Sequence, residues 1–175
     1  MNVFQKSAVK FSPSYQRTRI LKTFFLFPIH LKNNPKNTIY HTAQLYDDIH
    51  WWKKNDFEFW TNLFHETDGD MVLEIACGTG RLAQIFLREG AQYTGLEIEP
   101  DFVRCAKKKL SIFGDLVSIV EGDMRSFYLG KKFDFIFIGF NSFLHLLTDK
   151  DAMDFFRCVQ RYMHENSRFI IDIYI

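Results

Sequence analysis

The residues from Met71 to Ala83 include the types that bind a nucleotide-like cofactor. An apolar run that carries one acid, Glu74, leads into Gly78-Thr79-Gly80, and apolar residues at helical spacing follow. Glycine lets the backbone turn sharply and approach a ligand, and the first turn of a helix presents unpaired N–H groups. A strand, a glycine turn and a helix start in this order predict a cofactor site.

The glycine pattern alone leaves two classes of adenosine cofactor open. Gly78, Gly80 and Ala83 satisfy the G-x-G-x-x-G/A fingerprint of dinucleotide sites, and Glu97 follows Gly78 by 19 residues. Glu74, however, precedes the first glycine by four residues. A carboxylate there disfavours a pyrophosphate and favours a cofactor that carries an ammonium and a sulfonium group.

A second acid supports the cationic cofactor. Asp123 and Met124 follow the apolar run from Leu116 to Glu121. The acid could accept a hydrogen bond from an adenine amino group, while the apolar neighbour covers the ring or offers its N–H group. Turn formation after a strand is the alternative role for Asp123.

Together these residues resemble the class I S-adenosylmethionine-dependent methyltransferases. The glycine loop, Glu97, Asp123-Met124 and the apolar run from Phe133 to Gly139 have the order and spacing of that family. The resemblance covers residues 42 to 175. The stretch GFNSFLHL, from Gly139 to Leu146, is most similar to small-molecule N-methyltransferases of the glycine N-methyltransferase type.

The resemblance implies roles for particular residues. Glu97 would accept hydrogen bonds from the ribose hydroxyls, with Glu99 as a competitor, and an N-terminal aromatic helix would close over the sulfonium. Asn141 would orient the substrate, and His145 would bond to cofactor or substrate. The expected cofactor contacts are Tyr46, Trp52, Glu74, Ala76, Gly78, Gly80, Arg81, Glu97, Ile98, Asp123, Met124, Gly139 and Phe140.

The implied function is methyl transfer from S-adenosyl-L-methionine to a nitrogen or oxygen nucleophile of a small molecule. The leaving thioether is neutral, so the reaction needs alignment, exclusion of water and at most one base. Two alternatives stay open. The chain could bind the cofactor without turnover, as a scaffold, or it could be an NAD-dependent oxidoreductase.

Strand and helix patterns alternate along the chain. They predict an α/β fold with a doubly wound, Rossmann-like parallel sheet, helices on both faces and the motif residues at the carboxyl ends of the strands. Thr148 and Asp151 predict a helix cap. The expected strands are Met71–Ala76, Gln92–Ile98, Leu116–Glu121, Phe133–Gly139 and Arg168–Ile175.

Two further apolar patterns predict helices. Residues 42–66 are expected to form one or two helices, with Ile49, Trp52, Trp60, Leu63 and Phe64 near helical spacing. A second stripe is made of Ala152, Phe155, Phe156, Val159 and Met163.

The resembled family continues past its fifth strand with a helix and two more strands of a seven-stranded sheet. We therefore expect a methyltransferase-like domain at 42–175 that lacks the last two strands. Its apolar fifth strand would be an exposed edge, suited to self-association or to a complementing chain.

The charge distribution and the cysteine content limit the possible substrates and cellular settings of the protein. Residues 1–46 hold seven Lys or Arg, and all 21 acidic residues lie beyond them. The predicted catalytic domain therefore carries the acidic charge, which argues against a nucleic-acid substrate. Residues 1–41 are expected to be a basic extension, with a transit peptide or a binding arm as alternatives. Three cysteines without a C-x-x-C pair indicate a reducing, cytoplasmic setting (organellar if the leader is a transit peptide), with no disulfide and no metal site. No apolar run is long enough to span a membrane.

Overall fold

The computed structural model of the chain describes residues 42–173. The predicted N-terminal extension, residues 1–41, and the last two residues of the predicted fifth strand lie outside the described residues.

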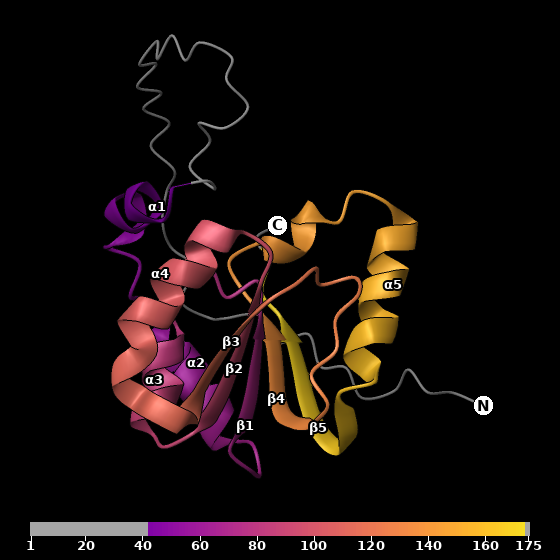
Figure 1. Cartoon of the computed structure of the whole chain (residues 1–175). Helices are drawn as coiled ribbons and strands as arrows, with labels where there is room; N and C mark the ends of the chain where they lie inside the picture. The colour runs from indigo at the N-terminus through magenta and orange to yellow at the C-terminus, as the bar shows by residue number, and fades with distance from the viewer. Residues whose placement is uncertain (1–41, 174–175) are drawn as a thin grey trace, which may run out of the picture.

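A five-stranded parallel sheet forms the centre of the structure (Figure 1). The strand order is β3-β2-β1-β4-β5, so β1 lies in the middle, and every neighbouring pair is parallel. This confirms the predicted parallel α/β fold. The strands are β1 (Met71–Ile75), β2 (Gln92–Glu97), β3 (Val117–Glu121), β4 (Phe133–Ile138) and β5 (Met163–Ile171).

Helices cover both faces of the sheet, as predicted (Figure 1). Three helices pack on one face: α2 (Phe57–His65), α3 (Ala83–Arg88) and α4 (Pro100–Leu110). The other face holds α5 (Asp149–Gln160). A short helix, α1 (Ala43–His50), lies beside one end of α4, and two 3-10 helices, η3 (Ser111–Leu116) and η4 (Ser142–His145), complete the described elements.

Trp60 is the largest side chain in the core between the sheet and α2 to α4. It is fully buried, and its ring lies 4.6 Å from that of Phe137 on β4. On the opposite face, Phe155 of α5 is fully buried, and Tyr162 stacks on Phe127 at 4.8 Å. Because β1 and β4 are buried on both faces, they are apolar almost throughout.

The structure corrects the predicted bounds of the last strand. β5 begins at Met163, which pairs with Phe133, and an irregular register follows before Arg168 pairs with Phe135. The Ser167 hydroxyl donates to the Phe133 carbonyl across this irregularity. Met163 therefore belongs to the strand and not to the apolar face of α5. Phe156, predicted on that face, is 40% exposed.

Two other helix predictions are confirmed. The Thr148 hydroxyl accepts a hydrogen bond from the Asp151 amide at 3.1 Å, which confirms the predicted cap of α5. The stretch from 42 to 66 forms two helices, and Trp60 is buried while Ile49 and Trp52 are 44% and 58% exposed. The helical conformation is interrupted between His50 and Phe57, so a single apolar stripe does not run through both helices.

No helix in the part of the chain from 42 to 173 is both long enough and apolar enough to cross a lipid bilayer.

Two tryptophans offer a matched test of this core. Trp60 is fully buried, whereas Trp51 is 71% exposed. We expect Trp60→Ala to lower the free energy of unfolding by about 3–5 kcal/mol, because it removes a large buried ring. Trp51→Ala should change it by less than about 0.5 kcal/mol. Urea denaturation of both variants measures these changes. Equal losses of unfolding free energy in the two variants would contradict the burial of Trp60.

Candidate functional site

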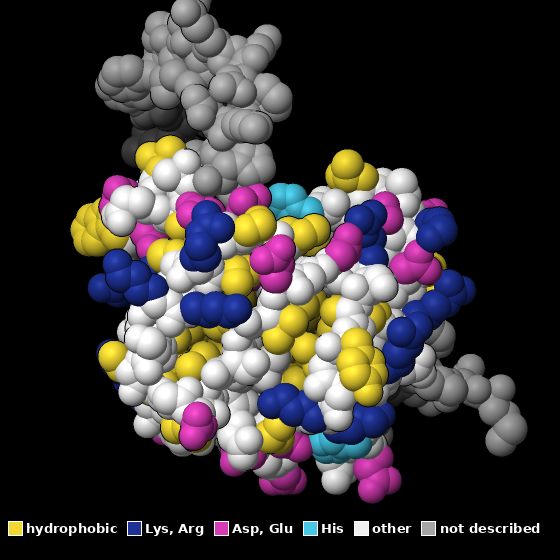
Figure 2. Space-filling model, in the orientation of Figure 1, with side chains coloured by type: hydrophobic (Ala, Val, Ile, Leu, Met, Phe, Trp, Pro, Cys, Tyr) yellow, Lys and Arg dark blue, Asp and Glu magenta, His cyan; other side chains and the backbone are white. Residues whose placement is uncertain are grey.

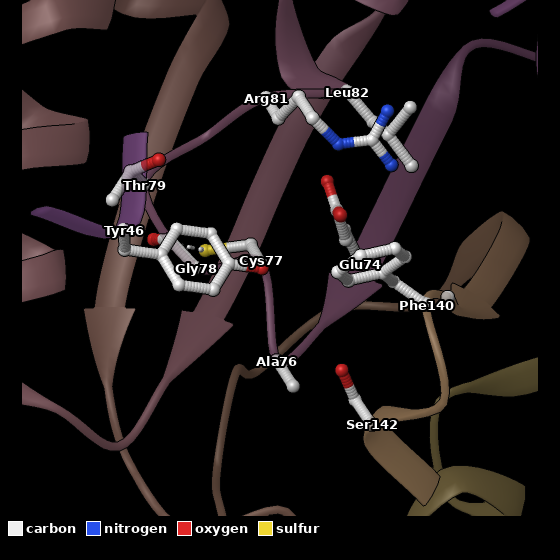
Figure 3. Close-up of a pocket in the computed structure, with 11 residues that line it drawn as sticks. Tyr46, Glu74, Ala76, Cys77, Gly78, Thr79, Arg81, Leu82, Phe140 and Ser142 are labelled. Carbon is white, nitrogen blue, oxygen red and sulfur yellow. Dashed lines mark hydrogen bonds between the residues drawn. The ribbon is translucent and has the colours of Figure 1, made fainter. Parts of the chain in front are cut away.

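A pocket opens where β1 and β4 end (Figure 3). The space between its walls, including the open mouth, is about 360 Å³. The lining residues come from α1, the end of β1, the glycine loop and the turn after β4. They are Tyr46, Glu74, Ala76, Cys77, Gly78, Thr79, Arg81, Leu82, Gly139, Phe140 and Ser142.

The backbone turns sharply on both sides of this pocket. Ala76 and Phe140, which follow β1 and β4, both have positive φ angles, 57° and 54°. Side chains other than glycine rarely adopt this conformation, which costs on the order of 1–2 kcal/mol. Gly80 also has a positive φ, and an added Cβ there would lie 2.8 Å from Leu110 on α4. A glycine is therefore needed for both the turn and the packing.

Glu97 ties the end of β2 to the glycine loop. Its carboxylate accepts the Gly78 amide at 2.8 Å and, through the other oxygen, the amides of Ile98 and Glu99 at 2.9 Å. The Glu97 residue is only 6% exposed. A carboxylate has about four lone-pair sites, and three are occupied here. One more hydrogen bond can be accepted without displacing an amide.

Glu74 is a second buried carboxyl group, on the central strand. It is 5% exposed and accepts the Tyr93 hydroxyl at 2.5 Å. Burial raises the pKa of Glu74 to about 8, even though the Tyr93 hydrogen bond and the Arg81 charge oppose the rise. Figure 3 shows the Glu74 carboxyl group and the Arg81 guanidinium pointing toward each other. At neutral pH this wall of the pocket is therefore mainly a neutral acid.

Arg81 joins the glycine loop to the segment between α1 and α2. Its guanidinium donates two hydrogen bonds to Asp56, at 2.8 and 2.9 Å, and a third to the Lys53 carbonyl at 2.9 Å. Burial opposes ionisation of Asp56, but these hydrogen bonds and the Arg81 charge outweigh it and lower the pKa of Asp56. The same guanidinium lies 5.7 Å from the centre of the Phe140 ring.

Asp123 already has a charged partner. It accepts from Arg125 at 2.5 Å, and Arg125 also reaches Asp151 at the start of α5. The Arg125 hydrogen bonds lower the pKa of Asp123. Neither Asp123 nor Met124 lines the pocket, and Met124 packs toward the core on the α5 face.

The remaining predicted residues divide into two groups. Tyr46, Glu74, Ala76, Gly78, Arg81, Gly139 and Phe140 line the pocket together. Gly80, within the loop, and Glu97, which accepts the Gly78 amide, are not among the lining residues. Trp52, Ile98, Asn141 and His145 do not line it. Ile98 is 60% exposed, and His145 lies exposed on η4. Asn141 has a positive φ of 63°, and its amide donates to the Asp172 carbonyl.

Several lining residues were not expected from the sequence. Cys77, Thr79 and Leu82 lie within or beside the glycine motif, so their positions in that motif could have identified them. Ser142 follows the predicted substrate residue Asn141 directly. No sequence pattern indicated that Tyr93 is the partner of Glu74, because only the parallel register of β1 and β2 brings the two side chains together.

The raised pKa of Glu74 predicts how stability depends on pH. The pKa rises from 4.5 to about 8, so the folded state holds a proton that the unfolded state releases in this range. The contribution of Glu74 to stability is complete below the unfolded pKa and is lost as the pH rises through the folded pKa.

A Glu74→Gln variant keeps an acceptor for Tyr93 but cannot ionise. Its thermal midpoint minus that of the wild type should therefore increase between about pH 5 and about pH 9. Glu121→Gln, at the exposed end of β3, is the control and should show a constant difference. A flat difference for Glu74→Gln would contradict the buried, protonated acid.

Comparison with known proteins shows which family the chain belongs to. A family model described as a methyltransferase domain matches residues 72–166. The chain is 33% identical over 84 residues to a dTDP-3-amino-3,4,6-trideoxy-alpha-D-glucopyranose N,N-dimethyltransferase of Streptomyces venezuelae, over 48% of this chain and 34% of the relative. It is also 33% identical over 97 residues to a malonyl-[acyl-carrier protein] O-methyltransferase of Priestia megaterium, over 51% of this chain and 34% of the relative.

Solved structures show the same fold. The CcbJ methyltransferase from Streptomyces caelestis superposes with a TM-score of 0.67 at 23% identity, over 77% of this chain and 57% of that one. The glycopeptide N-methyltransferase MtfA, complexed with (S)-adenosyl-L-methionine, gives 0.58 at 27% identity, over 70% and 52%.

The matched part spans only about a third to a half of the length of the curated relatives. The family match itself extends from β1 into β5 and covers more than half of the chain. It includes the glycine loop, Glu97 and the turn after β4, and it confirms the resemblance inferred from those residues. The chain belongs to the methyltransferase-domain family.

Proposed function

We propose that this chain binds S-adenosyl-L-methionine in the pocket at the ends of β1 and β4 and transfers its methyl group to a small molecule. One observation carries the proposal. The buried acid Glu74 and the aromatic rings of Tyr46 and Phe140 line the pocket beside the glycine loop (Figure 3), and a second buried acid, Glu97, accepts the Gly78 amide of that loop. Aromatic ring faces suit the sulfonium of a cationic adenosine cofactor, and Glu74, when it loses its proton, adds a negative charge that disfavours a pyrophosphate.

The relatives support this proposal. The MtfA structure contains (S)-adenosyl-L-methionine at 27% identity. Both curated relatives at 33% identity are methyltransferases, one acting on nitrogen and the other on oxygen. The family match favours methyl transfer over the NAD-dependent alternative, and it leaves the acceptor atom, nitrogen or oxygen, open for this chain.

The residues present fit such a cofactor. When bound, it would supply an electrophilic methyl group on a sulfonium. Tyr46 and Phe140 would offer ring faces to that cation, and Glu97 would accept one ribose hydroxyl with its remaining lone pair. Asp123 could accept from an adenine amine only by sharing its oxygens with Arg125.

The acceptor would enter from the turn after β4. Ser142 lines the pocket there, next to Asn141, the proposed orienting residue. His145 is the proposed hydrogen-bonding partner of the cofactor or substrate, and it lies exposed on η4 outside the pocket lining. The main tasks of the protein are to align the nucleophile with the methyl group and to exclude water.

Several further properties of the chain, expected from its sequence, are proposed together with methyl transfer. The chain could bind the cofactor without turnover, and the outer edge of β5 could pair with a second or complementing chain. We also propose a domain that starts near residue 42, a small-molecule rather than a nucleic-acid substrate, and a cytoplasmic or organellar location.

Glu97 gives the sharpest test of cofactor binding. We expect Glu97→Ala to raise the dissociation constant for S-adenosyl-L-methionine by about 10- to 100-fold, because it removes a ribose acceptor and the anchor of the Gly78 amide. Glu99→Ala, two residues away, should change the constant by less than about threefold. Isothermal titration calorimetry of both variants measures this.

Circular dichroism of both variants serves as the folding control. A folded Glu97→Ala protein with unchanged affinity would remove the proposed ribose role. A loss confined to Glu99→Ala would transfer that role to Glu99.

A further inference from the structure

The docking of α1 rests on few apolar contacts. Ala43 is the only buried residue of this helix. Leu45 and Ile49 are each 44% exposed, and Figure 2 shows hydrophobic side chains on the solvent-facing surface of the helix, at the upper left. A helix of eight residues is too short to be stable alone in water. Its position must therefore depend on specific polar and aromatic contacts.

Asp47 supplies the densest set of these contacts. One carboxylate oxygen accepts the Thr79 hydroxyl at 2.5 Å. The other forms an ion pair with Lys109 and accepts the Cys105 thiol at 3.8 Å. Lys109 and Cys105 belong to α4, whereas Thr79 lies between the two glycines of the loop. One side chain thus joins α1 both to α4 and to the glycine loop that lines the pocket.

The Thr79 hydroxyl depends on this bond. Thr79 is 1% exposed and lines the pocket. A buried hydroxyl that loses its partner carries a desolvation cost, so removing the Asp47 carboxylate affects the glycine loop as well as the helix.

Tyr46 is the residue that α1 brings to the pocket. Its ring lies 5.0 Å from Phe102 and 4.2 Å from His50, and the His50 ring lies 5.3 Å from Phe140. Because Tyr46 and Asp47 are adjacent on one short helix, fixing Asp47 on Thr79 and Lys109 fixes the Tyr46 ring as well.

We propose that Asp47 is a positioning residue, which docks α1 on the glycine loop and thereby holds Tyr46 over the cofactor pocket. This inference rests on the proposed function, because the ligand is S-adenosyl-L-methionine. The helix remains attached through its C-terminal side, where Asp56 pairs with Arg81 at 2.8 Å. The Ala43 amide also donates to Asp101 of α4 at 2.8 Å. We therefore expect loss of the Asp47 contacts to loosen α1 while the core stays intact.

Two pairs of variants test this role. Asp47→Ala removes the carboxylate, and Asp48→Ala is its control, since Asp48 is exposed and bonds to Gln44 of the same helix. Thr79→Val removes the hydroxyl at nearly constant shape, whereas Thr79→Ser keeps it. The measurements are the dissociation constant for S-adenosyl-L-methionine and hydrogen exchange of the amides in residues 43–50 without cofactor.

We expect Asp47→Ala and Thr79→Val each to weaken binding by about 10-fold or more, and to accelerate exchange in α1 by a similar factor. Asp48→Ala should stay within about twofold of the wild type, and Thr79→Ser, which keeps the hydroxyl, should bind more tightly and exchange more slowly than Thr79→Val. The Asp47→Ala/Thr79→Val double variant should resemble Asp47→Ala instead of multiplying the two effects, because the bond that Thr79→Val removes is already absent in Asp47→Ala.

The outcomes separate this inference from the proposed function. If Asp47→Ala matches Asp48→Ala in exchange and affinity, the positioning role is overturned. Faster exchange with unchanged affinity also overturns it, since the helix would then move without consequence for the pocket. If the wild type binds no S-adenosyl-L-methionine, the proposed function fails, and the exchange data still decide whether Asp47 docks α1.

Discussion

The hydrogen bond from the Gly78 amide to the Glu97 carboxylate is the contact on which the rest of the site depends. It joins the loop after β1 to the end of β2, beside the bond from the Cys77 amide to the Leu96 carbonyl. Once the loop is fixed, its side chains fix other elements: Thr79 reaches α1, and Arg81 reaches the segment before α2. The pocket is the space that these attachments leave open.

The two buried acids of the site serve different purposes. Glu97 accepts three backbone amides and so acts as a fixed anchor for the loop. Glu74 has one short bond to Tyr93, and burial raises its pKa to about 8. A group that changes charge near neutral pH, in the wall of a pocket proposed for a cationic ligand, couples the protonation of the protein to what the pocket holds.

The sequence predicted what depends on local chemistry. The glycine loop, the parallel order of apolar strands and the Thr148 cap follow from residue types at short spacing, and the structure contains all three. Predictions from the sequence were wrong where the structure of a residue depends on contacts with residues far away in the chain. Met163 joins β5 because it pairs with Phe133, and Trp52 stays exposed because α1 ends before it. Asp47 and Tyr93 gave no signal, since the fold alone brings them to Thr79 and Glu74.

The central claim is that the pocket binds S-adenosyl-L-methionine, and calorimetric titration of the unaltered chain tests it most directly, with NAD titrated in parallel. We expect a dissociation constant in the micromolar range, on the order of −8 kcal/mol, for S-adenosyl-L-methionine and no heat of binding for NAD. Binding of NAD alone, or of neither ligand by a folded sample, would contradict the account.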